Sequence, residues 1–251
     1  MSQVVVITGG GTGIGRAAAL RFAAEGYTVV VSGRRLEKLE ETRDAATGTV
    51  VPVAGDVGEA SGAGRIIEAS ARLGDIVCVV NNAGVGWDYG ARVPGSMAAL
   101  RETSADNWRD VMRINLDSVY FMCHAALQHL SAGGSIVNVA SVGGLKGMTD
   151  AHTYATTKAG MINLTRSLAK TYGPEGIRAN VVAPGFTDTD MVRPVLDSDH
   201  NPFANDATRF QVTPLGRPGT PEEMADAIYF MGVQATYCNG AVLVVDGGAM
   251  A

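Results

Sequence analysis

Short apolar runs alternate with amphipathic stretches along the first half of the chain. The apolar runs cover residues 4–7, 28–31, 50–53 and 76–80, and helical patterns begin near Ile14, Leu36 and Gly64. Continuous apolar runs rich in β-branched residues are typical of parallel strands that are buried on both faces of a sheet. The pattern therefore predicts an α/β fold in which helices cover both faces of a doubly wound parallel sheet.

The second half continues this pattern but also contains two longer irregular stretches. Strands are expected at 136–139, at a run that ends near Ala183, and at 241–245, with helices at 119–127 and 154–171. The irregular stretches are 84–103 and 186–216, and long loops at the carboxyl edge of such a sheet are usually lids or specificity loops. We expect 186–216 to be the substrate loop. Expected pocket-lining residues are Trp87, Tyr89, Met148, His152, Met191 and Phe203.

Composition and charge narrow the class of protein. The chain has 251 residues, 46% of them hydrophobic and 18% charged, which predicts a single domain over residues 1–251. With a net charge of −5 and scattered Lys and Arg, we expect neither nucleic acid nor a membrane as a partner. Residues 1–7 leave no room for a secretory leader, and the apolar runs are far below the ~20 residues of a membrane span. A cytoplasmic protein is expected.

The three cysteines do not form a recognisable chemical motif. Cys78, Cys123 and Cys238 are far apart and lie in apolar or helical surroundings. An odd number at such spacing predicts reduced packing residues, with neither a disulfide framework nor a metal site.

A glycine-rich turn follows the first predicted strand. Residues 8–15 read Thr-Gly-Gly-Gly-Thr-Gly-Ile-Gly and lead into a helix. Glycines at such a turn let a pyrophosphate approach backbone N–H groups at the helix N-terminus. The spacing differs from the usual dinucleotide fingerprint, and the lysine of a phosphate-binding loop is absent. The turn predicts a Rossmann-like dinucleotide site whose contacts are Gly9, Gly11, Thr12, Gly13, Ile14 and Gly15.

The end of the second strand bears on the choice of cofactor. Dinucleotide folds that bind NAD usually carry a carboxylate there, whereas residues 31–35 read Val-Ser-Gly-Arg-Arg. Because a guanidinium suits a 2′-phosphate, Arg34 favours NADP, and NAD stays open as an alternative. In that alternative Arg34 stacks on the adenine or faces solvent. The glycine turn has Thr12 where a second basic residue would have supported NADP.

Two further segments follow strands and suit a nucleotide. Asp56 and Val57 follow the third strand, where a carboxylate accepts a hydrogen bond from an adenine amino group. Asn82, Ala83 and Gly84 follow the fourth strand and suit a cofactor wall, although such turns are also ordinary connectors.

Tyr154 and Lys158 lie four residues apart in a predicted helix. Positions with this spacing share a helix face, so the phenol and the ammonium approach one volume. A nearby cation lowers the pKa of a tyrosine from its usual ~10, which makes the phenol a better acid or base at neutral pH. The alternative is a solvated Tyr and Lys on the helix surface.

In this order along the chain, residues 8–15, 81–84 and 154–158 resemble the motifs of the short-chain dehydrogenase/reductase family. The resemblance covers nearly the whole chain and points to the 3-oxoacyl reductase-like branch. Ser141, Asn115 and the pair Pro184 and Gly185 agree with it as well.

The resemblance implies a role for each of these positions. Tyr154 is similar to the family's acid/base, and Lys158 to the residue that lowers its pKa and holds the nicotinamide ribose. Ser141 resembles the donor that polarises the substrate oxygen, and Asn115 the residue that bends its helix and holds a water near Lys158. Ser141 as a loop cap and Asn115 as a satisfied helix residue are the alternatives. Implied nicotinamide contacts are Pro184, Gly185, Thr187 and Thr189.

The implied activity is hydride transfer between NADP, or NAD, and a carbonyl or secondary alcohol of a small molecule. A non-catalytic NADP-binding sensor or scaffold, a 3-oxoacyl-carrier-protein reductase and a strictly NAD-dependent alcohol dehydrogenase are the alternatives. The substrate loop has five Asp against two Arg, and 125–135 offers no base except His129, which disfavours an acidic carrier protein. The resemblance also implies a homotetramer through 119–127, 155–168 and the last strand, with a dimer still open.

Overall fold

The computed structural model of this protein describes residues 2–199 and 201–251. Met1, on which the expected absence of a leader partly rests, and His200, inside the expected substrate loop, lie outside the described residues. Among the described residues, no helix is long and apolar enough to cross a membrane.

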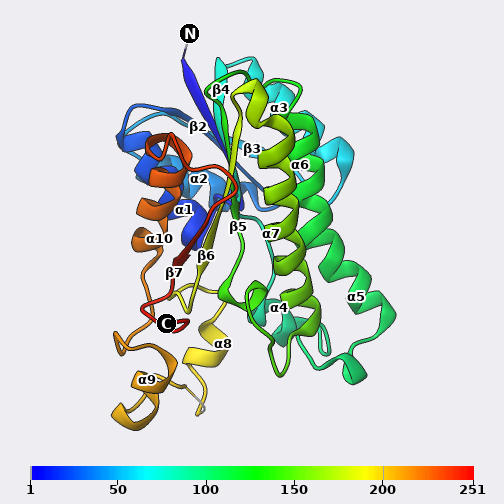
Figure 1. Ribbon diagram of the computed structural model, residues 1–251, viewed down its shortest axis with the longest axis vertical. Coiled ribbons are helices and arrows are strands. Elements are labelled where there is room, and N and C mark those ends of the chain that lie inside the picture. The colour runs from blue at the N-terminus through cyan, green and yellow to red at the C-terminus, as the bar shows by residue number, and fades with distance from the viewer. Residues whose placement is uncertain (1, 200) are drawn as a thin grey trace.

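Seven parallel strands form one twisted sheet (Figure 1). Their order across the sheet is β3-β2-β1-β4-β5-β6-β7, and every neighbouring pair is parallel. The strands are β1 (Gln3–Thr8), β2 (Thr28–Gly33), β3 (Val50–Ala54), β4 (Asp75–Asn81), β5 (Ser135–Val139), β6 (Arg178–Pro184) and β7 (Val242–Val245). The order reverses between β1 and β4, which creates a crevice at their carboxyl ends, where ligands bind in such folds. The predicted doubly wound sheet is confirmed.

Helices cover both faces of the sheet. They are α1 (Gly13–Ala24), α2 (Leu36–Ala45), α3 (Ala60–Ala71), α4 (Trp87–Arg92), α5 (Ala105–Met112), α6 (Ser118–Ala126), α7 (His152–Tyr172), α8 (Arg193–Leu196), α9 (Asp206–Val212) and α10 (Pro221–Tyr229). Alternate residues of β1 enter different cores, because side chains along a strand point to opposite faces. Val4 and Val6 pack in the core under α3, α6 and α7, and Val5 and Ile7 in the core under α1, α2 and α10.

The two stretches expected to be irregular contain short helices. Residues 84–103 include α4 and a 3₁₀-helix, Leu100–Glu102, and residues 186–216 include α8 and α9. The sequence analysis did not place these helices, because short helices of one or two turns are fixed by packing more than by their own sequence. These helices lie beneath the carboxyl ends of the strands in Figure 1.

The sequence analysis placed no element at α10, although its start carries a recognisable signal. Thr220 caps the helix by accepting a hydrogen bond from the backbone N–H of Glu223, whose side chain accepts one from the N–H of Thr220. Pro221 occupies the first turn. This reciprocal capping box with a proline at the first helical position is a typical helix start.

The last residues turn back toward the substrate loop after β7. The backbone N–H of Leu215 donates to the carbonyl of Gly247 at 3.2 Å. A Cβ on Gly248 would lie 3.0 Å from the Pro214 ring. The carboxyl end of the chain therefore lies at the same end of the molecule as α8 and α9 (Figure 1).

Candidate active site

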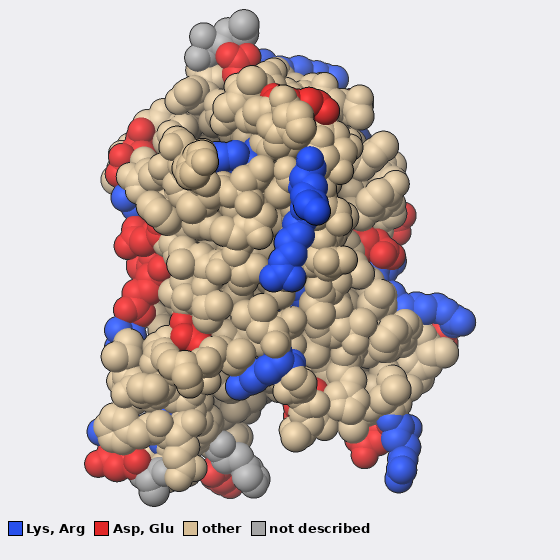
Figure 2. All heavy atoms as spheres, in the orientation of Figure 1, with Lys and Arg blue, Asp and Glu red and all other residues tan. Residues whose placement is uncertain are grey.

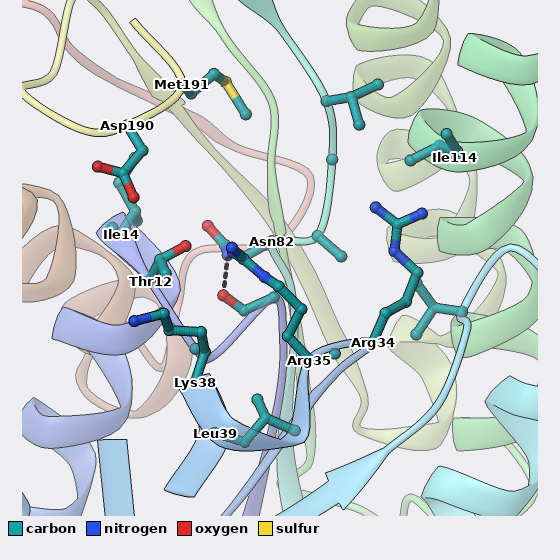
Figure 3. A pocket seen from close by; sticks show the side chains of 18 of the residues that line it. Thr12, Ile14, Arg34, Arg35, Lys38, Leu39, Asn82, Ile114, Asp190 and Met191 are labelled. Carbon is teal, nitrogen blue, oxygen red and sulfur yellow. Dashed lines mark hydrogen bonds between the residues drawn. The ribbon is translucent and has the colours of Figure 1, made fainter. Parts of the chain in front are cut away.

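A groove runs along the carboxyl ends of β1, β2, β3 and β4 (Figure 3). It contains most of the positions predicted to hold a cofactor, namely Gly9, Gly11, Thr12, Gly13, Ile14, Arg34, Asp56, Val57, Asn82, Ala83, Gly84 and Thr189. Residues from widely separated parts of the sequence thus form one surface, because parallel strands all end at the same edge.

The glycine turn forms one wall of this groove. Gly9 and Gly13 have φ angles of +67° and +52°, a conformation that glycine adopts without strain. A Cβ on Gly9 would lie 2.9 Å from the Cα of Ala83, so a side chain there would clash with the segment that follows β4. Gly15 does not line the groove: a Cβ on it would lie 2.3 Å from the carbonyl oxygen of Gly9. Gly15 thus packs closely behind the turn, and its cofactor contact stays a prediction.

Thr8 and Asn82 join the ends of β1 and β4. The Thr8 hydroxyl accepts hydrogen bonds from the backbone N–H groups of Asn82 and Ala83, both at 3.0 Å. The side-chain amide of Asn82 donates to the Thr8 carbonyl at 3.1 Å. These bonds fix the floor of the groove at the point where the strand order reverses.

Three cations lie at the end of β2. Arg34, Arg35 and Lys38 all line the groove, and in Figure 3 Arg34 and Lys38 extend toward opposite sides of it. Lys38 lies beside Gly11, whose Cβ would meet the Cβ of Lys38 at 2.9 Å, and its ammonium pairs with Glu41 at 2.7 Å. The sequence analysis missed Lys38, which the two preceding bases and the start of α2 could have indicated.

Asp56 reaches the groove, but protein groups already engage its carboxylate. One oxygen accepts a hydrogen bond from the N–H of Gly58 at 2.9 Å, and the other lies 3.4 Å from the Arg113 guanidinium. Arg113 was not singled out from the sequence. The adenine contact of Asp56 stays a prediction.

Ser141, Tyr154 and Lys158 lie together at the carboxyl end of β5. Tyr154 and Lys158 are both buried on α7, and the Lys158 Nζ lies 5.7 Å from the centre of the Tyr154 ring. Ser141 caps the 3₁₀-helix Val142–Gly144 by accepting from the N–H of Gly143 at 3.0 Å. Its hydroxyl and the Tyr154 ring both lie close to Gly143, 3.5 and 3.6 Å from a Cβ placed there. The surface-pair alternative is therefore wrong, whereas Ser141 is both a cap and a neighbour of the phenol.

Burial dominates the electrostatics of this cluster. Burial raises the pKa of Tyr154 above its usual 10, and the neighbouring Ser141 hydroxyl only partly opposes that rise. Burial lowers the pKa of Lys158 from 10.5 to about 8. The Lys158 ammonium donates to the Val139 carbonyl at 2.8 Å, and the lowering of the Tyr154 pKa by Lys158 stays a prediction.

Asn115 lies in a π-helix, Arg113–Asp117, which interrupts the helical path between α5 and α6. Its side-chain oxygen accepts from the N–H of Val85 at 2.7 Å, and its amide donates to the Val85 carbonyl at 3.0 Å. A Cβ on Gly84 would lie 3.1 Å from the Asn115 oxygen and 3.8 Å from the Lys158 Nζ. Asn115 thus holds the wall segment beside Lys158, and single-turn π-helices are frequent at functional sites.

Three predicted nicotinamide contacts do not line this groove, and their contact with the cofactor stays a prediction. Gly185 backs onto Asp246, whose Cα would lie 2.8 Å from an added Cβ. Thr187 is buried, pairs with Gly219 in an isolated bridge, and donates its hydroxyl to the Gly185 carbonyl at 3.2 Å. Pro184 is the last residue of β6, pairs with β7 and is buried. Thr189, in contrast, faces the turn, with its Cγ2 3.2 Å from a Cβ on Gly13.

The residues expected to line the substrate pocket divide into two groups. Trp87 packs against Tyr154 and Phe203 packs against Phe186, while Met191 lines the groove and Met148 lies beside Gly143 next to the phenol. Tyr89 instead donates to Asp110, and His152 accepts from the N–H of Leu100 at 3.0 Å, so both anchor loops. Phe186, which stacks on Trp87, was missed.

Comparison with known proteins places the chain among oxidoreductases. A family model described as enoyl-(acyl carrier protein) reductase matches residues 9–250. Meso-2,3-butanediol dehydrogenase from Serratia marcescens is 37% identical over 254 residues, which cover 100% of this chain and 95% of that protein. The 3-oxoacyl-[acyl-carrier-protein] reductase of Chlamydia muridarum is 35% identical over 99% of this chain and 97% of its own length.

A solved structure agrees with these relatives. The crystal structure of levodione reductase superposes with a TM-score of 0.87 at 33% identity, and the match covers 98% of this chain and 96% of that one.

Proposed function

The chain belongs to the short-chain dehydrogenase/reductase family, and from this premise we propose that Ser141, Tyr154 and Lys158 are its catalytic residues. The protein is an oxidoreductase that acts on CH–OH groups. One observation carries the proposed roles. A serine hydroxyl and a buried phenol ring both lie beside Gly143, 3.5 and 3.6 Å from a Cβ placed there, and a buried ammonium lies 5.7 Å from the centre of the phenol ring.

A dinucleotide fits the groove on two grounds. Gly9 and Gly13, at positive φ, leave bare backbone at the groove surface, and Arg34, Arg35 and Lys38 supply positive charge for phosphate groups. When bound, the nicotinamide supplies hydride to a carbonyl carbon or accepts it from an alcohol carbon. The glycine turn, Asn82 and Thr189 would hold the cofactor.

In the reducing direction, the hydroxyls of Ser141 and Tyr154 donate hydrogen bonds to the substrate carbonyl oxygen. As the carbon is reduced, the O–H bond of Tyr154 breaks and its proton goes to that oxygen. The raised pKa of Tyr154 keeps the phenol protonated at neutral pH, which suits an acid. Lys158, whose pKa burial lowers to about 8, is proposed to return a proton to the Tyr154 oxygen after the transfer.

Asn115 supports this cluster as a positioning residue. Its two hydrogen bonds to Val85 hold Gly84 close to the Lys158 ammonium. A larger residue at 84 would approach Nζ to 3.8 Å. The proposed proton exchange therefore depends on the shape of the wall segment as well as on the lysine itself.

The preferred cofactor is proposed to be NADP. Three cations after β2 support this preference, because an adenosine 2′-phosphate adds negative charge at that end of the groove. Replacing Arg34 or Lys38 with Ala is expected to raise KM for NADP about 10- to 100-fold, since charged hydrogen bonds are each worth ~1.5–3 kcal/mol. KM for NAD is expected to change little. Arg65→Ala, an exposed position on α3, is the matched control.

The experiment is initial-rate kinetics with both cofactors, together with cofactor titration without substrate. If the wild-type protein prefers NAD, or if Arg34→Ala affects both cofactors equally, the NADP proposal fails. If cofactor binds but a panel of ketones, diketones and alcohols leaves it unconsumed, the protein is a sensor and the catalytic proposal fails.

A free small carbonyl compound or secondary alcohol is the proposed substrate. The names of relatives include a butanediol dehydrogenase and a carrier-protein reductase, so both substrate kinds belong in the panel. Figure 2 shows side chains of both charge signs at the lower end of this face, around the site of α8 and α9. A mixed rim of this kind favours an uncharged small substrate over an acidic carrier protein.

A homotetramer is the proposed assembly. Several large apolar side chains are exposed on α6, on β7 and near α10, namely Tyr120, Leu215, Phe230 and Val244. Exposed apolar surface of this kind marks protein interfaces. Light scattering at several protein concentrations tests the assembly, and a monomer at all of them contradicts it. Location in the cytoplasm stays a prediction, which fractionation of the source cells checks.

A further inference from the structure

A row of aromatic rings leads away from the phenol of Tyr154. The ring centres of Trp87 and Tyr154 are 5.8 Å apart with an interplanar angle of 49°. Trp87 stacks on Phe186 at 6.1 Å and 25°, and the edge of Phe203 meets Phe186 at 5.6 Å and 74°. All three distances lie within the ~4.5–7 Å at which aromatic rings contact one another. These four residues come from three distant segments of the chain, and we call Trp87, Phe186 and Phe203 the aromatic wall.

Two loops carry the aromatic wall, and a backbone hydrogen bond joins them. The N–H of Asp88 donates to the carbonyl of Met191 at 2.9 Å. Met191 also covers Gly86, whose Cβ would meet its side chain at 2.7 Å. The hydrogen bond and this contact therefore join the segment that carries Trp87 to the segment that carries Phe186 and Phe203.

Two acidic residues that flank this wall in the sequence are paired within their own loops. Asp88 pairs with Arg92 at 2.8 Å, and Asp188 pairs with Arg193 at 2.9 Å. A charged substrate would have to displace one of these pairs or leave its own charge unpaired against aromatic rings, and both cost free energy. An uncharged substrate meets neither cost.

The position of Trp87 beside the phenol relates the wall to the chemistry. A carbonyl oxygen that accepts hydrogen bonds from Ser141 and Tyr154 lies ~2.7–2.8 Å from each hydroxyl. Its carbon skeleton then begins next to the indole, because the two ring systems are in contact. Met148 also lies near the two hydroxyl-bearing residues. A Cβ on Gly143 would lie 2.7 Å from the Met148 sulfur, 3.5 Å from the Ser141 hydroxyl and 3.6 Å from the Tyr154 ring.

Resting on the proposed function, we propose that Trp87 is a specificity-determining residue that selects uncharged carbonyl compounds or secondary alcohols on a flat or cyclic apolar skeleton. A ring buries a face against the indole without first losing the rotational freedom that a linear chain must give up. The wall thus discriminates between a cyclic and a linear ketone that have the same reacting group.

The test compares cyclohexanone, linear 2-hexanone of equal carbon number, and anionic acetoacetate, with the purified full chain and saturating cofactor. The wild-type protein is expected to have the highest kcat/KM for cyclohexanone. Trp87→Ala is expected to lower that value about 10- to 100-fold, mainly through KM, and to leave 2-hexanone nearly unchanged. Trp87→Phe retains an aromatic face and is expected to keep most of the preference.

A matched control comes from the other end of the sheet. Tyr237 is fully exposed and lines a groove with Gln3 and Asp75, so Tyr237→Ala removes an aromatic ring away from the site. Tyr237→Ala is expected to leave the ratio of kcat/KM for cyclohexanone to kcat/KM for 2-hexanone unchanged. If Trp87→Ala does not fold, Trp87→Leu, which removes the aromatic face but keeps an apolar side chain, supplies the same comparison.

Two failures are distinguishable. If the wild-type protein reduces 2-hexanone or acetoacetate at least as well as cyclohexanone, or if the cyclohexanone preference survives in Trp87→Ala, the inference about Trp87 is overturned while the oxidoreductase function stands. If cofactor binds but no carbonyl or alcohol is turned over, the proposed function fails, and the inference fails with it.

Discussion

Replacing Lys158 with Met tests the electrostatics of the site through stability as well as activity. The amine is buried, and burial lowers its pKa from 10.5 to about 8. Because one pH unit corresponds to ~1.4 kcal/mol, holding this amine protonated in the folded protein costs about 3 kcal/mol. Methionine has a similar shape and carries no charge.

The sign follows from proton binding. Below pH 8 the lysine is protonated in both the folded and the unfolded protein, so the cost is present in full. Between about pH 8 and 10.5 the unfolded chain binds the proton more tightly than the folded one, so wild-type stability rises with pH relative to Lys158→Met. From pH 8 to 9.5 the wild-type-minus-variant difference in unfolding free energy is expected to grow by about 2 kcal/mol.

The assay is urea unfolding of both proteins at several pH values and one fixed protein concentration. Buried thiols such as Cys78, whose pKa is raised to about 11, also change stability with pH, but they are common to both proteins and cancel in the difference. Lys170→Met, at an exposed position on the same helix, is the control and is expected to give a flat difference. A flat difference for Lys158→Met as well would refute the reasoning. Lys158→Met is also expected to lose turnover.

Three further predictions concern the phenol, the glycine turn and the π-helix. Tyr154→Phe is expected to abolish turnover and to leave cofactor affinity nearly unchanged in a fluorescence titration; substantial remaining turnover would exclude the phenol as the acid. Gly15→Ala places a Cβ 2.3 Å from a carbonyl oxygen of the turn and is expected to lower both the melting temperature and cofactor affinity, whereas Gly64→Ala, with nothing within 4 Å, is expected to lower neither. Asn115→Ala leaves the N–H and C=O of buried Val85 without their partner and is expected to lower the unfolding free energy by about 2–4 kcal/mol in urea titrations. Equal stability of Asn115→Ala and the wild type would contradict the role of Asn115 in holding Val85.

The strands were predictable because their signal is local. Runs such as 4–7 and 76–80 are apolar at every position, and the observed strands Gln3–Thr8 and Asp75–Asn81 extend them by only one residue at each end. The helix expected from Tyr154 begins two residues earlier, at His152, after Ala151 in a left-handed conformation. Nothing in the sequence announces a positive φ at an alanine.

The sequence predicted the site well where the residue type and its place at a strand end determine the chemistry. It predicted less where the chemistry depends on how side chains pack in the folded protein. The residues of the groove follow strand ends, so the topology brings them together. The pKa of Tyr154 depends instead on burial and on the neighbouring Ser141 hydroxyl, and sequence spacing reveals neither. Phe186 and Lys38 were missed because each becomes part of the site only through contacts with distant residues.

The path of the last residues has a practical bearing on how the protein is handled. Because Gly247 and Gly248 pack against Leu215 and Pro214, an affinity tag fused to the carboxyl end would sit against the segment proposed to admit substrate. A tag placed before β1 emerges at the far end of the sheet (Figure 1). Purification handles and immobilisation linkers therefore belong ahead of Gln3, where they leave the catalytic rim unobstructed.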